Sequence, residues 1–126
     1  MAKEISVKKR QVVYEKFNGR CAYCGDPLLY KNMDVDHITP KYRGSTHSEI
    51  RAYGLEKGTN DIENLNPSCK SCNSSKSTFT VSNWKKQLEL KHDRLLRDNA
   101  SYRILNRFGA IKYNNNITFH FEKYNK

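Results

Sequence analysis

The spacing of apolar residues along the chain predicts a protein built mainly of helices. Ser6 is a residue type that caps helices, and apolar side chains then recur at helical spacing as far as Phe17, with Gly19 just beyond. Comparable spacing, interrupted at Asn99 and Gly109, predicts further helices over residues 81–97 and 101–108, and a helix over residues 69–76 can start inside the second cysteine pair. Helices therefore make up most of the regular structure that we expect.

Two pairs of short apolar runs predict hairpins. The pairs are residues 28–30 with 33–38 and residues 111–113 with 117–121. Between them, residues 39–60 mix glycine and proline with charged residues, which predicts a long surface loop with a helical turn near residues 48–53. The expected order is a helix, a hairpin, a loop, several helices and a second hairpin.

The composition narrows the class of protein. A chain of 126 residues has the length of one domain, and 37% hydrophobic residues are enough for a small core. The 23 Lys and Arg residues outnumber the 13 Asp and Glu residues, so the net charge of +10 favours a polyanionic partner, nucleic acid before anionic membrane. No apolar run is long enough for a membrane span or a secretory signal, so we expect a cytoplasmic protein without a membrane partner.

Four cysteines form two CxxC pairs, Cys21 with Cys24 and Cys69 with Cys72. In a reduced compartment such pairs bind metal more often than they form disulfides, and together they supply the four thiolates of a closed, structural Zn²⁺ site. A zinc ion would also stabilise a small domain with a lean core. Two unrelated pairs or a redox-active CxxC are the alternatives. In the zinc interpretation the two cysteine pairs enclose residues 25–68, so we expect a functional site within that segment.

Asp36 and His37 are adjacent within the enclosed segment, at the end of a predicted strand. Side chains alternate along a strand, so the two should face different partners. A carboxylate directed at a divalent cation and a neutral imidazole directed at a water are the two groups that phosphodiester hydrolysis needs. A strand-end carboxylate beside a solvated histidine is the alternative, and the dipeptide alone does not decide between them.

A longer pattern surrounds this dipeptide. It covers about residues 20–77 and consists of Cys21-x-x-Cys24-Gly25, Asp34-Val35-Asp36-His37-Ile38-x-Pro40 and Asn64-Leu65-Asn66-Pro67-x-Cys69-x-x-Cys72-Asn73-x-x-Lys76. In order, spacing and residue type, the pattern resembles the HNH endonuclease family of the ββα-metal superfamily. The resemblance is to small, free-standing members of the phage type that carry a four-cysteine structural zinc.

The resemblance implies a role for each matching residue. His37 corresponds to the general base that activates the attacking water, and Asn64 to the residue that braces the loop and orients that base. Asp36 and Asn73 correspond to ligands of a catalytic Mg²⁺ or Mn²⁺ ion, for which carboxylate and amide oxygens are suitable donors. The implied reaction is hydrolysis of DNA phosphodiester bonds to 3′-hydroxyl and 5′-phosphate ends.

The resemblance also implies an α+β fold. Its ββα-metal core would be a β-hairpin and a helix clipped by the four-cysteine zinc site, flanked by N- and C-terminal helices and a small C-terminal hairpin. We expect one domain over residues 1–126, with the motif core at 20–77 and an appendage at 81–126. Zinc on the second cysteine pair would then keep the helix that carries Asn73 in register with the strand that carries Asp36.

Basic residues near the motif are candidate contacts to DNA phosphates. One lies a helical turn beyond Asn73 and the others lie in the 39–60 loop; they are Lys76, Lys41, Arg43 and Arg51. A solvated helix face is the alternative for the first, and a solvated surface loop for the insert. Double-stranded DNA is the expected partner in the nuclease interpretation.

Two other functions keep the same fold. A zinc-stabilised nucleic-acid binding module would lack catalysis, and an accessory subunit of a packaging or restriction complex would add phage packaging proteins as partners. The presence of Asp36, His37 and Asn73 together favours the enzyme.

Overall fold

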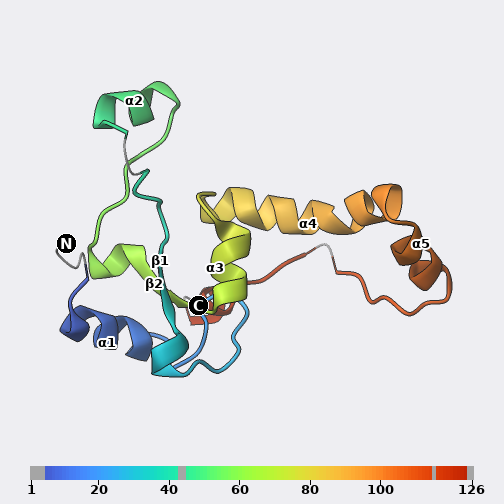
Figure 1. The fold of residues 1–126 in the computed structure, drawn as a ribbon, viewed down its shortest axis with the longest axis horizontal. Coiled ribbons are helices and arrows are strands. Elements are labelled where there is room, and N and C mark those ends of the chain that lie inside the picture. Colours follow the sequence, from blue (N-terminus) through green and yellow to red (C-terminus); the bar gives the residue numbers. More distant parts are fainter. Residues whose placement is uncertain (1–4, 43–44, 115, 125–126) are drawn as a thin grey trace.

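A two-stranded antiparallel sheet organises the computed structural model, which describes residues 5–42, 45–114 and 116–124 (Figure 1). Strand β1 (Asp34–His37) pairs with β2 (Leu65–Ser68), so that Asp34 lies opposite Ser68 and His37 lies opposite Leu65. Every residue of β2 is buried, because helix α1 packs against it. The sheet thus joins two segments that are distant in sequence.

The hairpin predicted for residues 28–30 and 33–38 is wrong. Residues Tyr30–Asn32 form a short 3₁₀ helix, η1, instead of a turn between two strands. The guanidinium group of Arg10 donates hydrogen bonds to the carbonyls of Tyr30 and Met33, at 2.7 and 2.8 Å. These carbonyls are therefore satisfied by a side chain of α1, and β1 takes its ladder partner from β2.

The predicted helices are confirmed, each beginning after a side-chain cap. They are α1 (Val7–Glu15) after Ser6, α3 (Lys70–Lys76) after Cys69, α4 (Val81–Asp98) after Thr80 and α5 (Ala100–Arg107) after Asn99. Figure 1 shows α4 extending from the end of α3, with α5 at its far end. Of the helices in the described ranges, none combines the length and the apolar character that crossing a membrane requires.

The 39–60 insert carries the expected helical turn as α2 (His47–Ala52), which begins with a capping box between Thr46 and Glu49. Figure 1 shows α2 at the tip of the insert, away from the sheet. A second 3₁₀ helix, η2 (Ile62–Asn64), then leads into β2. At the neck of the insert, the backbone N–H of Gly58 donates to the Pro40 carbonyl at 2.8 Å.

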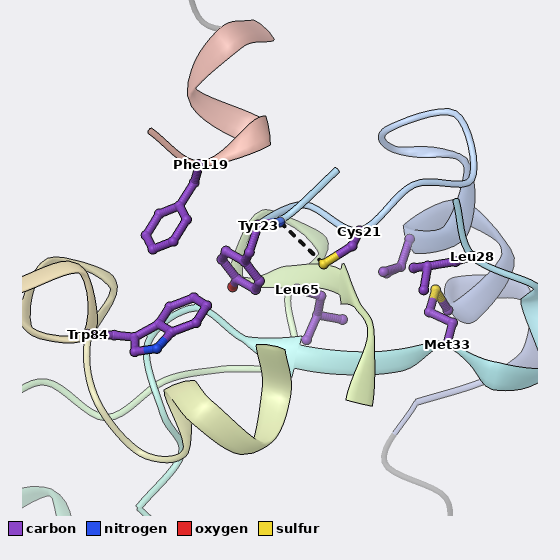
Figure 2. Packing of buried hydrophobic residues seen from close by; sticks show 8 residues of the cluster. Cys21, Tyr23, Leu28, Met33, Leu65, Trp84 and Phe119 are labelled. Atoms are coloured by element: carbon purple, nitrogen blue, oxygen red, sulfur yellow. Dashed lines mark hydrogen bonds between the residues drawn. The ribbon is translucent and has the colours of Figure 1, made fainter. Parts of the chain in front are cut away.

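The core lies where the first cysteine pair meets α4 and the C-terminal segment. Tyr23, Trp84 and Phe119 are buried together in Figure 2, and the Trp84 and Phe119 rings stack with centroids 4.7 Å apart. The C-terminal residues that follow form a 3₁₀ helix, η3 (His120–Tyr124). The start of α4 and the C-terminal segment therefore complete the core through Trp84 and Phe119.

The second predicted hairpin is also wrong. Residues 111–114 and 116–119 contain no regular strand in the part of the chain that the structure describes. The N–H of His120 donates to the Tyr23 carbonyl at 2.9 Å, and the N–H of Ile117 donates to the Glu89 carboxylate at 3.1 Å. The backbone of this segment bonds to the rest of the protein instead of to itself.

Candidate active site and cysteine cluster

The four cysteines converge as the two CxxC pairs predict. Their sulfur atoms all lie within 4.8 Å of one another, and Sγ of Cys24 is 3.9 Å from Sγ of Cys69. A tetrahedral zinc ion with Zn–S bonds of about 2.3 Å requires sulfur atoms about 3.8 Å apart. All four are free thiols, so the cluster fits one zinc ion. Cys21, Cys24, Cys69 and Cys72 would hold it.

The thiols influence one another strongly. A hydrogen bond from Cys72, aided by backbone donors and opposed by burial, lowers the pKa of Cys21 to about 4. Burial raises the pKa of Cys24 to about 11, and the hydrogen bond to Cys21 raises the pKa of Cys72. The cluster therefore loses one proton easily and resists losing more. A bound dication would offset the negative charge of the further thiolates.

The cysteine cluster fixes α3 against the sheet. Sγ of Cys69 caps α3 by accepting a hydrogen bond from the N–H of Cys72 at 3.4 Å. On the other side, the N–H of Ala22 donates to the Pro67 carbonyl of β2 at 2.9 Å. The two cysteine pairs thus connect the start of α3 to β2, and α3 in turn packs against β1.

Asp36 points into the protein from β1. Its carboxylate accepts a hydrogen bond from the Tyr23 hydroxyl and lies 3.3 Å from Nζ of Lys76. Burial raises the pKa of this carboxyl, although Tyr23 and Lys76 both act in the opposite direction. Burial also raises the pKa of Tyr23 far above its ordinary range, so the phenol stays protonated and donates to the carboxylate.

The interpretation of Lys76 as a phosphate contact is wrong. The side chain is fully buried, and Nζ also donates to the backbone carbonyl of His37 at 2.9 Å. Residues three or four apart lie on the same face of a helix, so Lys76 faces β1 as Asn73 does, three residues before it. Lys76 therefore supports Asp36 and His37 from inside and is inaccessible to a phosphate.

The side chain of His37 has a different partner from that of Asp36, as strand alternation predicts. Its Nε2 atom lies 2.7 Å from Oδ1 of Asn60. Asn64 lies nearby and holds the loop: Oδ1 accepts from the N–H of Thr39 at 2.8 Å, and Nδ2 donates to the carbonyls of Thr39 and Thr59 at 3.0 and 2.8 Å. Asn64 thus contacts the loop backbone, while Asn60 contacts the imidazole.

Asn73 lies on α3 and faces β1. Its amide nitrogen donates to Asp34 at 3.0 Å, and Lys70 forms an ion pair with the same carboxylate at 2.9 Å. Despite partial burial, the hydrogen bonds from Lys70 and Asn73 lower the pKa of Asp34. Asp34 therefore remains ionised and orients the amide of Asn73.

A cavity of about 570 Å³ brings the candidate residues together. Asp36 and His37 of β1 line it with Asn73 of α3, and Lys41 of the insert lines its edge. Arg51 is exposed on α2, and Arg43 lies outside the described residues. Asp36, His37 and Asn73 thus share one solvent-accessible hollow, which Asn64 does not line, whereas the described candidate phosphate contacts lie in different places.

Asp34 and Asn60 are site residues that the sequence analysis missed. Asp34 is two positions before Asp36 and so lies on the same side of β1, which strand periodicity alone indicates. No comparable signal exists for Asn60, because its contact with His37 depends on the path of the insert. Its only sequence indication is its position just ahead of Asn64.

The fold and the site together define an α+β protein in which a four-cysteine cluster joins a small sheet to the helix beside a polar cavity. Comparison with known proteins is consistent with this class. Residues 21–79 match the family model described as HNH endonuclease. This segment, which contains all four cysteines as well as His37 and Asn73, is therefore similar to the HNH endonuclease family.

Individual relatives agree. The chain is 32% identical over 77 residues to the CRISPR-associated endonuclease Cas9 of Corynebacterium diphtheriae, an alignment that covers 61% of this chain and 6% of Cas9. It is 37% identical over 73 residues to YoqL, an SPbeta prophage-derived protein of Bacillus subtilis whose name carries the term HNH endonuclease; here 54% of this chain and 27% of YoqL are covered. The chain thus spans only a small part of both relatives.

A solved structure shares the fold. The Type II-C Cas9 enzyme from Actinomyces naeslundii superposes with a TM-score of 0.50 and 24% sequence identity, over 79% of this chain and 10% of the Cas9 chain. The likeness extends beyond the matched family segment, so helices outside residues 21–79 also take part in the shared architecture.

Proposed function

We propose that this protein is a metal-dependent endonuclease that hydrolyses DNA phosphodiester bonds and leaves 3′-hydroxyl and 5′-phosphate ends. The observation that carries the proposal is the single cavity lined by Asp36, His37 and Asn73. A carboxylate, an imidazole and an amide in one hollow provide oxygen donors for a cation and an acceptor for a proton. The match of residues 21–79 to the HNH endonuclease family model supports the same chemistry.

His37 acts as the general base in this proposal. The imidazole takes a proton from a water molecule, and the resulting hydroxide attacks the phosphorus atom. Lys76 fixes the backbone carbonyl of His37, which keeps the residue at the edge of the cavity. Asn64 braces the loop that follows by bonding both backbone groups of Thr39.

Asp36 and Asn73 would hold the catalytic divalent cation. Asn73 uses its amide nitrogen on Asp34, which leaves the amide oxygen as its donor, and Asp36 contributes a carboxylate. Hard oxygen donors of this kind suit Mg²⁺ or Mn²⁺, so the residues fit the ion. When bound, the ion supplies Lewis-acid stabilisation of negative charge on the phosphate and the leaving oxygen.

Double-stranded DNA is the proposed substrate. The net charge of +10 attracts a polyanion, and the insert places Lys41 at the edge of the cavity and Arg51 on the exposed surface of α2. These two residues, together with Arg43, are proposed to contact phosphates flanking the scissile bond. The four-cysteine cluster is proposed to bind one structural zinc ion.

Cleavage of a supercoiled plasmid tests the proposal. With Mg²⁺ or Mn²⁺ the parent protein should nick or linearise the plasmid, and EDTA should stop it. His37→Ala should reduce the rate by about 10²–10⁴-fold while DNA binding in a gel-shift assay is retained. His47→Ala, which removes an exposed histidine of α2, is the matched control and should cleave at the parental rate. Products that DNA ligase reseals would establish the proposed ends.

The alternative functions predict different outcomes. A non-catalytic binding module would shift DNA and cleave none of it with either metal, and this result would refute the nuclease. An accessory subunit would cleave only weakly on its own and would be captured by phage packaging proteins in a pull-down. Both cleavage outcomes can be read in the same assay, because binding and cleavage are scored separately.

A further inference from the structure

Asn60 makes the one hydrogen bond to the His37 ring within the described chain. Oδ1 of Asn60 lies 2.7 Å from Nε2 of His37. The hydrogen bond from Nζ of Lys76 to His37 is to its backbone carbonyl and leaves the ring free to turn. Asn60 itself is not part of the described lining of the cavity, so it would act on the reaction only through His37.

The chemistry of the two atoms determines where the imidazole proton is. An amide oxygen accepts hydrogen bonds and cannot donate them, so Nε2 of His37 must be the donor. A neutral imidazole carries one N–H, and the other nitrogen then holds a lone pair. With the proton on Nε2, the lone pair is on Nδ1.

We propose that Asn60 is a positioning residue that selects the Nε2–H tautomer of His37 and thereby makes Nδ1 the atom that accepts the proton of the attacking water. This inference rests on the proposed nuclease function. In the step it supports, an O–H bond of water breaks, Nδ1–H forms, and the hydroxide oxygen bonds to phosphorus as the P–O3′ bond breaks. The leaving oxygen takes its proton from solvent, and the Nε2–H···Oδ1 hydrogen bond persists throughout.

The backbone around Asn60 is held on both sides, as a positioning role requires. Nζ of Lys9 on α1 donates to the Asn60 carbonyl at 2.7 Å. Nδ2 of Asn64 donates to the carbonyl of the preceding residue, Thr59, at 2.8 Å. Asn60 is therefore fixed by the first helix and by the residue that braces the loop, which makes its side chain a rigid support for the ring.

The ring tautomer can be measured directly. Nitrogen-15 NMR of the zinc-loaded protein at neutral pH, without DNA or added Mg²⁺, should show a protonated Nε2 and an unprotonated Nδ1 for His37. Asn60→Leu removes the acceptor at similar volume and should give a mixture of tautomers. Asn60→Asp keeps an oxygen acceptor on a side chain of the same length and should retain the Nε2–H form. A parental protein in the Nδ1–H form would overturn the inference.

Plasmid-cleavage kinetics provide the second measurement. Asn60→Leu should lower kcat by about 10- to 100-fold with little change in KM, because supporting residues around a site typically contribute this much. Asn60→Asp should recover most of the loss, and Asn106→Leu, the same change on exposed α5, should match the parent. An unchanged kcat in Asn60→Leu would also overturn the inference. The tautomer is read without substrate, so it tests Asn60 even if the parental chain cleaves no DNA and the nuclease proposal fails.

Discussion

The ammonium group of Lys76 lies 3.3 Å from the carboxylate of Asp36, and 0% and 4% of the two side chains are exposed to solvent. A buried charge without its partner is costly, whereas the pair together is tolerated. Lys70 and Asp34 form a second ion pair between the same two elements, at 2.9 Å, but 74% of the Lys70 side chain is exposed. The two pairs therefore differ mainly in solvation.

Replacing the buried lysine should destabilise the protein far more than replacing the exposed one. Lys76→Met should lower the free energy of unfolding by about 3–5 kcal/mol, because it leaves the Asp36 carboxylate buried and unpaired. Lys70→Met should cost less than about 1 kcal/mol. Urea denaturation of the zinc-loaded protein measures both. Adding Asp36→Asn to Lys76→Met should recover part of the loss, and similar costs for the two lysine variants would contradict the burial argument.

The packing of the C-terminal segment against the core should weaken at acidic pH. Glu122 accepts from Nζ of Lys85 and from the N–H of Phe119, both at 2.6 Å, and the ion pair with Lys85 lowers the pKa of Glu122. Because the pKa of Glu122 is lower in the folded than in the unfolded state, the ionised carboxylate stabilises the folded state at pH values above 4.5, the pKa in the unfolded state. That stabilisation is lost as the pH falls from 4.5 towards the lower pKa of the folded state.

Trp84 reports this transition because it is the only tryptophan and it stacks on Phe119. Its fluorescence should change as the pH falls below about 4.5, the reference value for a glutamate side chain. In Glu122→Gln the acid-dependent part of the change should disappear. Glu56→Gln, on the exposed insert, is the control and should titrate like the parent. An identical profile in Glu122→Gln would show that another group is responsible.

Zinc should be required for folding. Purified protein should contain one zinc ion per chain, and its removal by a strong chelator should abolish the cooperative thermal transition, because structural zinc binding contributes on the order of 10 kcal/mol. Cys69→Ser should have the same effect, since it removes a ligand and alters the cap of α3. Ser71→Ala, in the same CxxC loop, should retain both metal and transition. A folded, metal-free protein would exclude the structural role.

Gly58 should be irreplaceable at the neck of the insert. An added Cβ would lie 1.7 Å from the Thr39 carbonyl oxygen, so Gly58→Ala must separate two backbone segments. We expect faster proteolysis within the insert and a lower cleavage rate, since Thr39 and Asn60 adjoin the His37 site. Gly54→Ala is the control: its φ of +72° brings a cost of about 1 kcal/mol, but nothing lies within 4 Å. Equal behaviour of the two variants would contradict the contact.

Contacts of the insert with DNA should be visible in the salt dependence of binding. Arg51→Ala should weaken binding to every duplex sequence alike and reduce the slope of log K against log salt by about 1, as expected for one lost phosphate contact. Ser48→Ala, on the same helix, should leave the slope unchanged. A parental slope in Arg51→Ala would place the DNA path elsewhere on the protein.

The sequence predicts local structure better than long-range pairing. Ser6 marks a helix start because a cap acts within three residues, and the two CxxC pairs predict the cysteine cluster because one tetrahedral metal ion needs four ligands. Both predicted hairpins fail for the opposite reason. The acceptors and donors of those segments are used by Arg10, Glu89 and the backbone of Tyr23, which no local pattern reveals.

The residues of the candidate site show the same contrast between local and long-range prediction. The predicted roles of Asp36, His37 and Asn73 come from the resemblance of the pattern at residues 20–77 to the HNH family, because the Asp36-His37 dipeptide alone does not decide them. The sequence predicts a surface position for Lys76, because a lysine near the end of a basic helix is usually solvated. Its burial depends on the carboxylate of Asp36, 40 positions away, which the packing of α3 on β1 brings into contact.

The closure at Gly58 and Pro40 makes the insert a self-contained unit. Its entry and exit meet at one point, so residues between them can be shortened, lengthened or exchanged without changing the span that the flanking chain must bridge. A chimaera that carries a different tip on this neck would keep the proposed hydrolytic centre intact while presenting a new surface to the proposed duplex substrate. Under the proposed function, the neck is thus a natural point of exchange for redesigning where along DNA the protein works.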